Sequence, residues 1–177
     1  MDLFEAISKR QSYRAGFKDE PISKEDLRKI VEAGLNAPSG KNAQTTSFVI
    51  IDEKQILEKI RQIHKGNNAM QQCQALIGCI IDKEPELIYE GHCFQVEDCA
   101  AAVENMLLAI TGLGYATVWI DGWLRVQGRA EEIGKLLGVP EGKVVRVVLP
   151  IGIADADYER PSKKPFEQRA WFNKYGE

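Results

Sequence analysis

Residues 98–122 read DCAAAVENMLLAITGLGYATVWIDG and predict the centre of the fold. Between residues 99 and 110 apolar side chains occupy nearly every helical face, which is typical of a helix buried on most sides. Roughly sixteen residues at about 1.5 Å each would span about 24 Å, the width of a small domain. Gly112 and Gly114 suit the end of such a helix, so we expect a long buried helix here.

The residues after this helix predict a strand and a turn. Residues 116–120 are apolar and partly β-branched, as in a buried strand. Asp121 and Gly122 then form a turn of the type that exposes backbone N–H groups. The same pattern also suits an ordinary core helix, strand and turn without a functional role.

Length and composition indicate a folded soluble protein of one domain. The chain has 177 residues, 44% hydrophobic and 28% charged. Its net charge of −3 gives no reason to expect nucleic acid or an anionic membrane as a partner. No apolar run is long enough to span a bilayer, and MDLFEAISKR predicts an amphipathic helix rather than a signal peptide. We therefore expect a cytoplasmic protein.

The cysteines do not predict a metal site. The chain contains four cysteines and two histidines, namely Cys73, Cys79, Cys93, Cys99, His64 and His92. Their spacing contains no CxxC pair, so a zinc site is not expected. We expect four reduced thiols, of which Cys93 is the most reactive.

Periodicity and turn residues predict the remaining elements. Ser23 can cap a second helix that ends near Asn36. Further helices are expected over residues 2–9, 54–63 and 129–137, with one helical turn over 69–74. Strands are expected over residues 47–52, 75–82 and 144–153, besides 116–120. The chain is thus predicted to be one α+β domain over residues 1–177, with four main strands and covering helices.

Residues 160–177 predict an arm without a core-facing side of its own. Its large side chains, which an isolated monomer would leave in water, are Phe166, Trp171, Phe172 and Tyr175. Exposed apolar side chains on an arm usually cover another surface. We therefore expect a partner subunit, and a symmetric homodimer is the commonest arrangement.

Three polar clusters are candidate binding sites. The first contains Arg10, Gln11, Ser12 and Arg14, whose guanidinium and hydroxyl groups can bind a phosphate, although basic surface turns are common. The second, residues 38–44, could hydrogen-bond the edge of a heterocyclic ligand, or it could be a polar loop whose groups bond one another. The third, residues 160–165, can close over an anion or lie in water. No GxGxxG, GxxxxGK[ST], GxSxG or HExxH motif is present, so a Rossmann or Walker loop is not expected.

The order of these motifs resembles the nitroreductase-like family of flavoproteins. The motifs, in order, are KRQSYR (9–14), APSGKNAQ (37–44), GLGYATVWIDG (112–122), VVLPIGIAD (147–155) and RPSKKP (160–165). The resemblance runs from residue 4 to about residue 165. It implies an α+β homodimer with a central, mainly antiparallel sheet of four to five strands flanked by helices. It also implies a C-terminal arm that crosses to the partner subunit, and one FMN in each of two interface sites.

The resemblance assigns FMN-binding roles to particular residues. Arg10 and Ser12 match ligands of the phosphate and ribityl groups, and Gln11 matches a position that bonds the flavin through side chain or backbone. Arg14 matches a cation beside flavin N1 and O2, where a guanidinium stabilises the negative charge of reduction. Pro38, Ser39 and Asn42, with Gln44 close by, match the loop that the other subunit places against the flavin.

The remaining matches lie elsewhere in the chain. Asp121 and Gly122 match a turn whose backbone N–H approaches flavin N5. Lys163, with its neighbour Lys164, matches a second phosphate ligand. Asn67 or Asn68 matches a polar residue expected before the second strand.

The sequence departs from the family pattern in two places. Gln44 is followed by Thr45 and Thr46, where relatives usually have Pro-Trp. In longer family members an insertion shapes the substrate pocket. Here it is reduced to residues 85–95, so the sequence does not predict the acceptor.

The resemblance implies an FMN-dependent NAD(P)H oxidoreductase. In ping-pong hydride transfer, NADH or NADPH reduces flavin N5 and leaves, and a nitroaromatic, quinone or related small acceptor then takes the electrons. The protein supplies position and electrostatics, so no protein nucleophile is needed. Two alternatives remain open: a flavin-binding storage or sensing protein without rapid turnover, and a cofactor-free dimerisation module.

Overall fold

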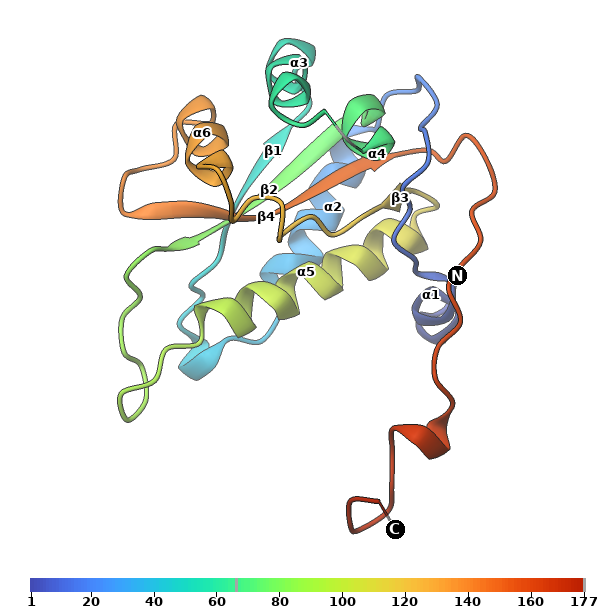
Figure 1. The fold of residues 1–177 in the computed structure, drawn as a ribbon, viewed down its shortest axis with the longest axis vertical. Coiled ribbons are helices and arrows are strands. Elements are labelled where there is room, and N and C mark those ends of the chain that lie inside the picture. Colours follow the sequence, from blue (N-terminus) through green and yellow to red (C-terminus); the bar gives the residue numbers. More distant parts are fainter. Residues whose placement is uncertain (66, 177) are drawn as a thin grey trace.

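The computed structural model describes residues 1–65 and 67–176, which form an α+β fold around a four-stranded antiparallel sheet (Figure 1). The strands are β1 (Ser47–Ile51), β2 (Ala75–Asp82), β3 (Ala116–Thr117) and β4 (Lys143–Gly152), in the order β1-β2-β4-β3. The helices are α1 (Leu3–Lys9), α2 (Lys24–Leu35), α3 (Lys54–Ile63), α4 (Asn68–Gln72), α5 (Gln95–Gly112) and α6 (Arg129–Leu136), with 3-10 turns η1 (Gly40–Asn42) and η2 (Phe166–Gln168). The predicted fold class and most predicted elements are therefore confirmed.

The strand β2 lies at the centre of two hydrophobic cores. Its alternate residues Leu76 and Ile80 face α3, α4 and α6, and Ile77 and Ile81 face α2 and α5. Burial on both faces explains the continuous apolar sequence of this strand. Figure 1 shows α2 and α5 on one side of the sheet and α3, α4 and α6 on the other. None of the described helices is long and apolar enough to cross a membrane.

The central helix α5 is longer and more exposed than expected. It begins at Gln95 and has 18 residues. Met106 and Ile110 are fully buried against the sheet and α2, but Val96 and Glu104 on other faces are exposed. Gly114 follows the helix with φ of 85°, which glycine adopts without strain. The helix is thus buried along one side rather than most of the way round.

The predicted strand over residues 116–120 is interrupted. Ladder pairing joins Ala116 to Gly152 and Thr117 to Ile151, and it resumes at Ile120 and Val148 in the same register. In that register the partner of Val118 is Pro150, which has no backbone N–H. The ladder is therefore broken by one imino acid on the neighbouring strand.

The C-terminal arm leaves the body of the protein past α1 (Figure 1). Arg160 donates a hydrogen bond to the Ser8 carbonyl oxygen at the end of α1. Further along, Phe166, Phe172 and Tyr175 are exposed, and Phe172 retains 80% of its accessible surface. The predicted exposure on one chain is confirmed for Phe166, Phe172 and Tyr175 but not for Trp171, which is half-buried with its ring 4.3 Å from that of Tyr175. The crossing of the arm to a partner stays a prediction.

Candidate functional site

The N-terminal segment that carries Arg10 to Arg14 is held against β3. The Tyr13 N–H donates to the Thr117 carbonyl oxygen at 2.8 Å. The Tyr13 hydroxyl lies 2.7 Å from the Gly16 carbonyl oxygen and 2.8 Å from Asp155 Oδ1. Burial and the contact with Asp155 raise the pKa of Tyr13, so its hydroxyl stays protonated as a donor. The buried Tyr13 therefore fixes the segment between the sheet and the start of the C-terminal arm.

The polar side chains of this segment differ in their surroundings. Arg10 Nε lies 3.7 Å from Glu104 Oε1 of α5, an ion pair that leaves most guanidinium donors available. Arg14 is exposed and donates to the Ser12 carbonyl oxygen at 3.2 Å. The Gln11 Oε1 atom is buried and has no hydrogen-bond partner in the described part of the chain. Such an acceptor is suited to a donor that a ligand would bring.

The turn after β3 has a backbone N–H group, that of Gly122, which is free to bind a ligand. The Leu124 N–H donates to the Asp121 carbonyl oxygen at 2.8 Å, which closes the turn. The Gly122 N–H donates to no acceptor among residues 1–65 and 67–176. A Cβ atom built on Gly122 would meet no atom within 4 Å. A flat ligand ring could therefore approach this backbone closely.

Two arginines that the sequence interpretation missed bind the Asp121 carboxylate. Arg125 donates to its two oxygens at 2.6 and 2.7 Å, and Arg146 of β4 donates to Oδ1. Burial alone would raise the pKa of Asp121, but the Arg125 hydrogen bonds and the charge of Arg146 outweigh it and lower this pKa. A charged residue inside the apolar run VVRVVLP was the available signal for Arg146.

The polar loop over residues 38–44 lies at the other end of α5. Figure 1 shows it beside the start of α5, whereas α1 and the segment that follows it lie towards the end of this helix. The Gly40 N–H donates to Asp98 Oδ1 at 2.9 Å, and the Gln44 N–H donates to Ser39 Oγ at 3.0 Å. Pro38, Asn42 and Gln44 are exposed. One chain therefore does not bring this loop together with Arg10 and Ser12.

The remaining predicted ligands are dispersed. Asn67 caps α4, and its Oδ1 accepts the Ala69 N–H at 2.9 Å. Ala69 and Met70 pack in the same cluster as Tyr13, so α4 lies close to the N-terminal segment. Lys163 and Lys164 are exposed on the arm, and within the described ranges no ion pair joins them to the body.

The four cysteines are free thiols. Cys73, Cys79 and Cys99 are buried, and Cys93 is half-buried. Burial raises the pKa of Cys73 to about 11, so this thiol stays protonated. Within residues 1–65 and 67–176 no three His, Cys, Asp or Glu side chains are grouped so that they could hold a metal ion.

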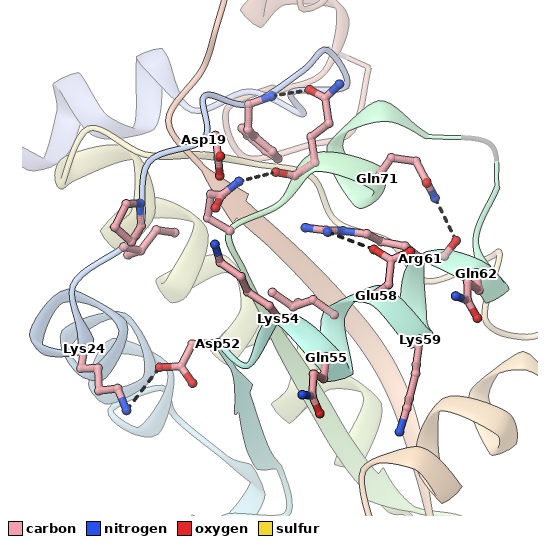
Figure 2. A pocket seen from close by; sticks show the side chains of 16 residues that line it. Asp19, Lys24, Asp52, Lys54, Gln55, Glu58, Lys59, Arg61, Gln62 and Gln71 are labelled. Atoms are coloured by element: carbon pink, nitrogen blue, oxygen red, sulfur yellow. Dashed lines mark hydrogen bonds and ion pairs between the residues drawn. The ribbon is translucent and has the colours of Figure 1, made fainter.

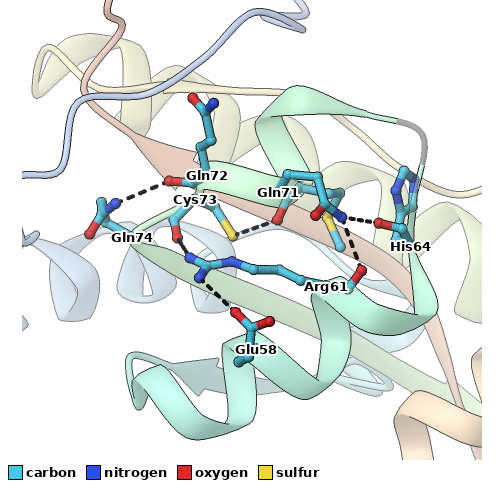
Figure 3. Close-up of polar contacts among 8 residues, drawn as sticks. Glu58, Arg61, His64, Gln71, Gln72, Cys73 and Gln74 are labelled. Carbon is cyan, nitrogen blue, oxygen red and sulfur yellow. Dashed lines mark hydrogen bonds and ion pairs between the residues drawn. The ribbon is translucent and has the colours of Figure 1, made fainter.

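A large groove is lined by none of the predicted ligands. It has a volume of about 1250 Å³ and lies between α3, α4 and residues 17–24 (Figure 2). A hydrogen-bonded polar network forms part of its wall: Arg61 donates to the Cys73 carbonyl oxygen at 2.7 Å, and Gln71 donates to the Arg61 carbonyl oxygen at 3.0 Å (Figure 3). Several groove side chains thus connect α3 to α4, and the groove contains none of the polar clusters singled out from the sequence.

Comparison with known proteins gives consistent matches along the chain. The sequence profile described as the Nitroreductase family matches residues 7–87 and 89–153. An Archaeoglobus fulgidus protein, provisionally named NADH dehydrogenase/NAD(P)H nitroreductase, is 31% identical over 172 residues, which cover 97% of this chain and 94% of that protein.

Two solved structures illustrate the structural likeness. An FMN-dependent nitroreductase from Clostridium difficile R20291 has a TM-score of 0.80 at 26% identity, covering 97% of this chain and 99% of that one. A nitroreductase with bound FMN from Bacteroides fragilis NCTC 9343 has a TM-score of 0.77 at 26% identity, and the match covers 93% of this chain and 95% of that one.

Proposed function

This chain belongs to the nitroreductase family, and we propose from that premise that it is an FMN-dependent oxidoreductase using NADH or NADPH as electron donor. The name of the Archaeoglobus fulgidus relative supports the nicotinamide donor. The FMN in the Bacteroides fragilis structure supports the cofactor. The proposed acceptors are nitroaromatics, quinones or similar small molecules.

The observation that carries the proposal is that an amide oxygen on the Arg10–Arg14 segment and a hydroxyl on β3 are both buried without a hydrogen-bond partner in the described part of the chain. Gln11 Oε1 and Thr117 Oγ1 are both buried without a partner among the described residues, and the Tyr13 N–H joins their two segments. A buried polar atom without a partner costs about 1–3 kcal/mol. The imide N–H of a flavin edge could donate to Gln11 Oε1, and a flavin carbonyl oxygen could accept from the Thr117 hydroxyl. The residues present therefore fit the cofactor.

The chain's own residues would bind and orient FMN from several sides. Arg10 and Ser12 would hold the phosphate and ribityl groups, with Lys163 and Lys164 supplying further positive charge. The exposed Arg14 would stabilise negative charge near N1 and O2 without transferring a proton. The Gly122 N–H would donate to N5. Bound FMN would supply the hydride chemistry, which requires no protein nucleophile.

A homodimer would complete each site. The loop carrying Pro38, Ser39 and Asn42 lies apart from the Arg10 segment within one chain, so a second copy would have to supply it. Apolar side chains on α1 are exposed, and Phe4 retains 80% of its accessible surface. Together with the aromatic side chains of the arm, they form surface that a partner would cover.

The first test is an absorbance spectrum of the purified protein from about 300 to 550 nm, the flavin region, before and after anaerobic addition of NADH or NADPH. We expect flavin bands at about one FMN per chain that bleach within seconds. Bands that persist would contradict turnover and indicate the inert flavin binder. A colourless protein that also fails to take up added FMN would contradict the proposal as a whole.

A further inference from the structure

We propose that Asp98 is a positioning residue that holds the loop over residues 38–46 in a preformed conformation and thereby sets the FMN affinity of the site that this loop completes. The inference rests on the proposed function. Asp98 lies in the first turn of α5 and retains only 6% of its accessible surface. It was not among the residues that the sequence indicated.

One carboxylate binds both ends of the loop. Asp98 Oδ1 accepts the Gly40 N–H at 2.9 Å, and Oδ2 accepts the Thr45 hydroxyl at 2.8 Å. Hydrogen bonds to a charged, buried acceptor are stronger than neutral ones. The two contacts fix the positions of residues 40 and 45, and hence the path of the four residues between them.

Those residues adopt a backbone conformation that they do not favour by themselves. Lys41, Asn42 and Gln44 have φ of 47°, 58° and 51°, in the left-handed region that residues with a Cβ rarely occupy. Such conformations persist where surrounding contacts determine them. Within the loop, Ser39 accepts from the Gln44 N–H through Oγ at 3.0 Å and from the Asn42 N–H through its carbonyl oxygen at 2.9 Å. From outside the loop, Asp98 is joined by Tyr89, whose ring centroid lies 5.0 Å from Lys41 Nζ, and by the Phe94 ring packed against Gly40.

Asp98 would act on a cofactor that it does not touch. Arg10 of the same chain approaches Glu104, six residues further along α5, and the loop lies towards the opposite end of this helix. In the proposed homodimer Ser39 and Asn42 would face the FMN of the neighbouring chain. Loss of the Asp98 contacts should therefore weaken FMN binding at the neighbour's site and leave the Arg10 segment of the same chain intact.

Four variants separate loop geometry from helix charge. Asp98→Ala removes both contacts, and Thr45→Val removes only one. Asp98→Asn keeps both, because the amide oxygen can accept from Gly40 and the amide nitrogen can donate to Thr45 Oγ1. Glu97→Ala is the matched control, since it removes an exposed carboxylate from the same turn of α5.

The readouts are the FMN dissociation constant, from quenching of FMN fluorescence, and hydrogen exchange of loop amides in FMN-free protein. We expect FMN binding to weaken about tenfold or more in Asp98→Ala, less in Thr45→Val, and within about threefold in Asp98→Asn and Glu97→Ala. Exchange over residues 40–45 should accelerate in Asp98→Ala while the fold, checked by circular dichroism, persists. Wild-type affinity in Asp98→Ala, or equal loss in Asp98→Asn, would overturn the inference.

Mixed dimers test whether the effect crosses the interface. Subunits carrying Arg10→Ala are combined with subunits carrying Asp98→Ala. If the loop acts on the neighbour, one of the two sites combines an intact Arg10 with an intact loop, so tight binding returns at one FMN per dimer. If tight binding does not return, action across the interface is contradicted. A wild-type protein that takes up no FMN would instead contradict the proposed function.

Discussion

Arg146 of β4 donates a hydrogen bond to the Asp121 carboxylate at the turn after β3. A β-bulge makes this contact possible. Cys79 pairs with Val147 and Ile80 pairs with Val145, so Arg146 is the extra residue on β4. Bulges redirect a side chain out of the regular alternation. The turn that would approach flavin N5 is thus tied to the sheet by a residue that the bulge redirects.

Replacing Arg146 by Gln should destabilise the protein by about 1–2 kcal/mol, because a largely buried charged donor is lost from Asp121. The Arg146 side chain is 16% exposed, whereas that of Arg125 is 57% exposed. Arg125→Gln is the matched variant and should have the smaller effect, since solvent screens exposed pairs. Urea unfolding of the two FMN-free variants measures the loss of unfolding free energy in each. An effect of Arg125→Gln equal to or larger than that of Arg146→Gln would contradict this ranking.

The Asp121 network should make stability depend on pH in a defined direction. Because its pKa is lowered in the folded protein, the ionised carboxylate is favoured by folding. This contribution is fully present above the unfolded pKa, about 4, and is lost as pH falls through the folded value. The difference in unfolding free energy between wild type and Asp121→Asn should therefore be constant near neutral pH and shrink below about pH 4. A difference that grows on acidification would contradict the assignment.

Much of the fold could be predicted from local sequence. Ser23 was expected to cap α2, and its hydroxyl accepts the Asp26 N–H at 3.1 Å. The central strand β2 has the bounds expected from its continuous apolar run. The break in β3 could not be predicted, because it depends on the register that places Val118 opposite Pro150 on another strand.

The candidate site could be predicted only where its motifs are contiguous. Arg10–Arg14 and Asp121–Gly122 were singled out from short motifs, and Tyr13 and Thr117 join their segments. Asp98 was missed because its partners, Gly40 and Thr45, are 58 and 53 residues away in the chain. A buried carboxylate on a mainly apolar helix is visible in the sequence, but its hydrogen-bond partners are not.

Packing beside the site predicts an asymmetry between two glycines. A Cβ on Gly152 would lie 2.4 Å from Phe17, whose segment pairs with Ala154, so Gly152→Ala should destabilise the protein by about 1–3 kcal/mol. A Cβ on Gly112 at the end of α5 would meet nothing within 4 Å, and Gly112→Ala should be neutral or stabilising by up to about 1 kcal/mol. Thermal unfolding of both variants measures these two changes in stability. A tolerated Gly152→Ala would show that Phe17 can move.

Replacing Gln11 by Met should change stability and cofactor affinity in opposite directions. Gln11 Oε1 is buried without a partner in the described part of the chain, so removing it should leave the FMN-free protein equally stable or more stable by about 1 kcal/mol. The same change removes an acceptor proposed for FMN and should weaken binding about tenfold. Thermal unfolding without FMN and fluorescence titration with FMN measure the two effects. If Gln11→Met destabilises the FMN-free protein and leaves FMN affinity unchanged, the side chain has a structural role and the buried oxygen is not a cofactor ligand.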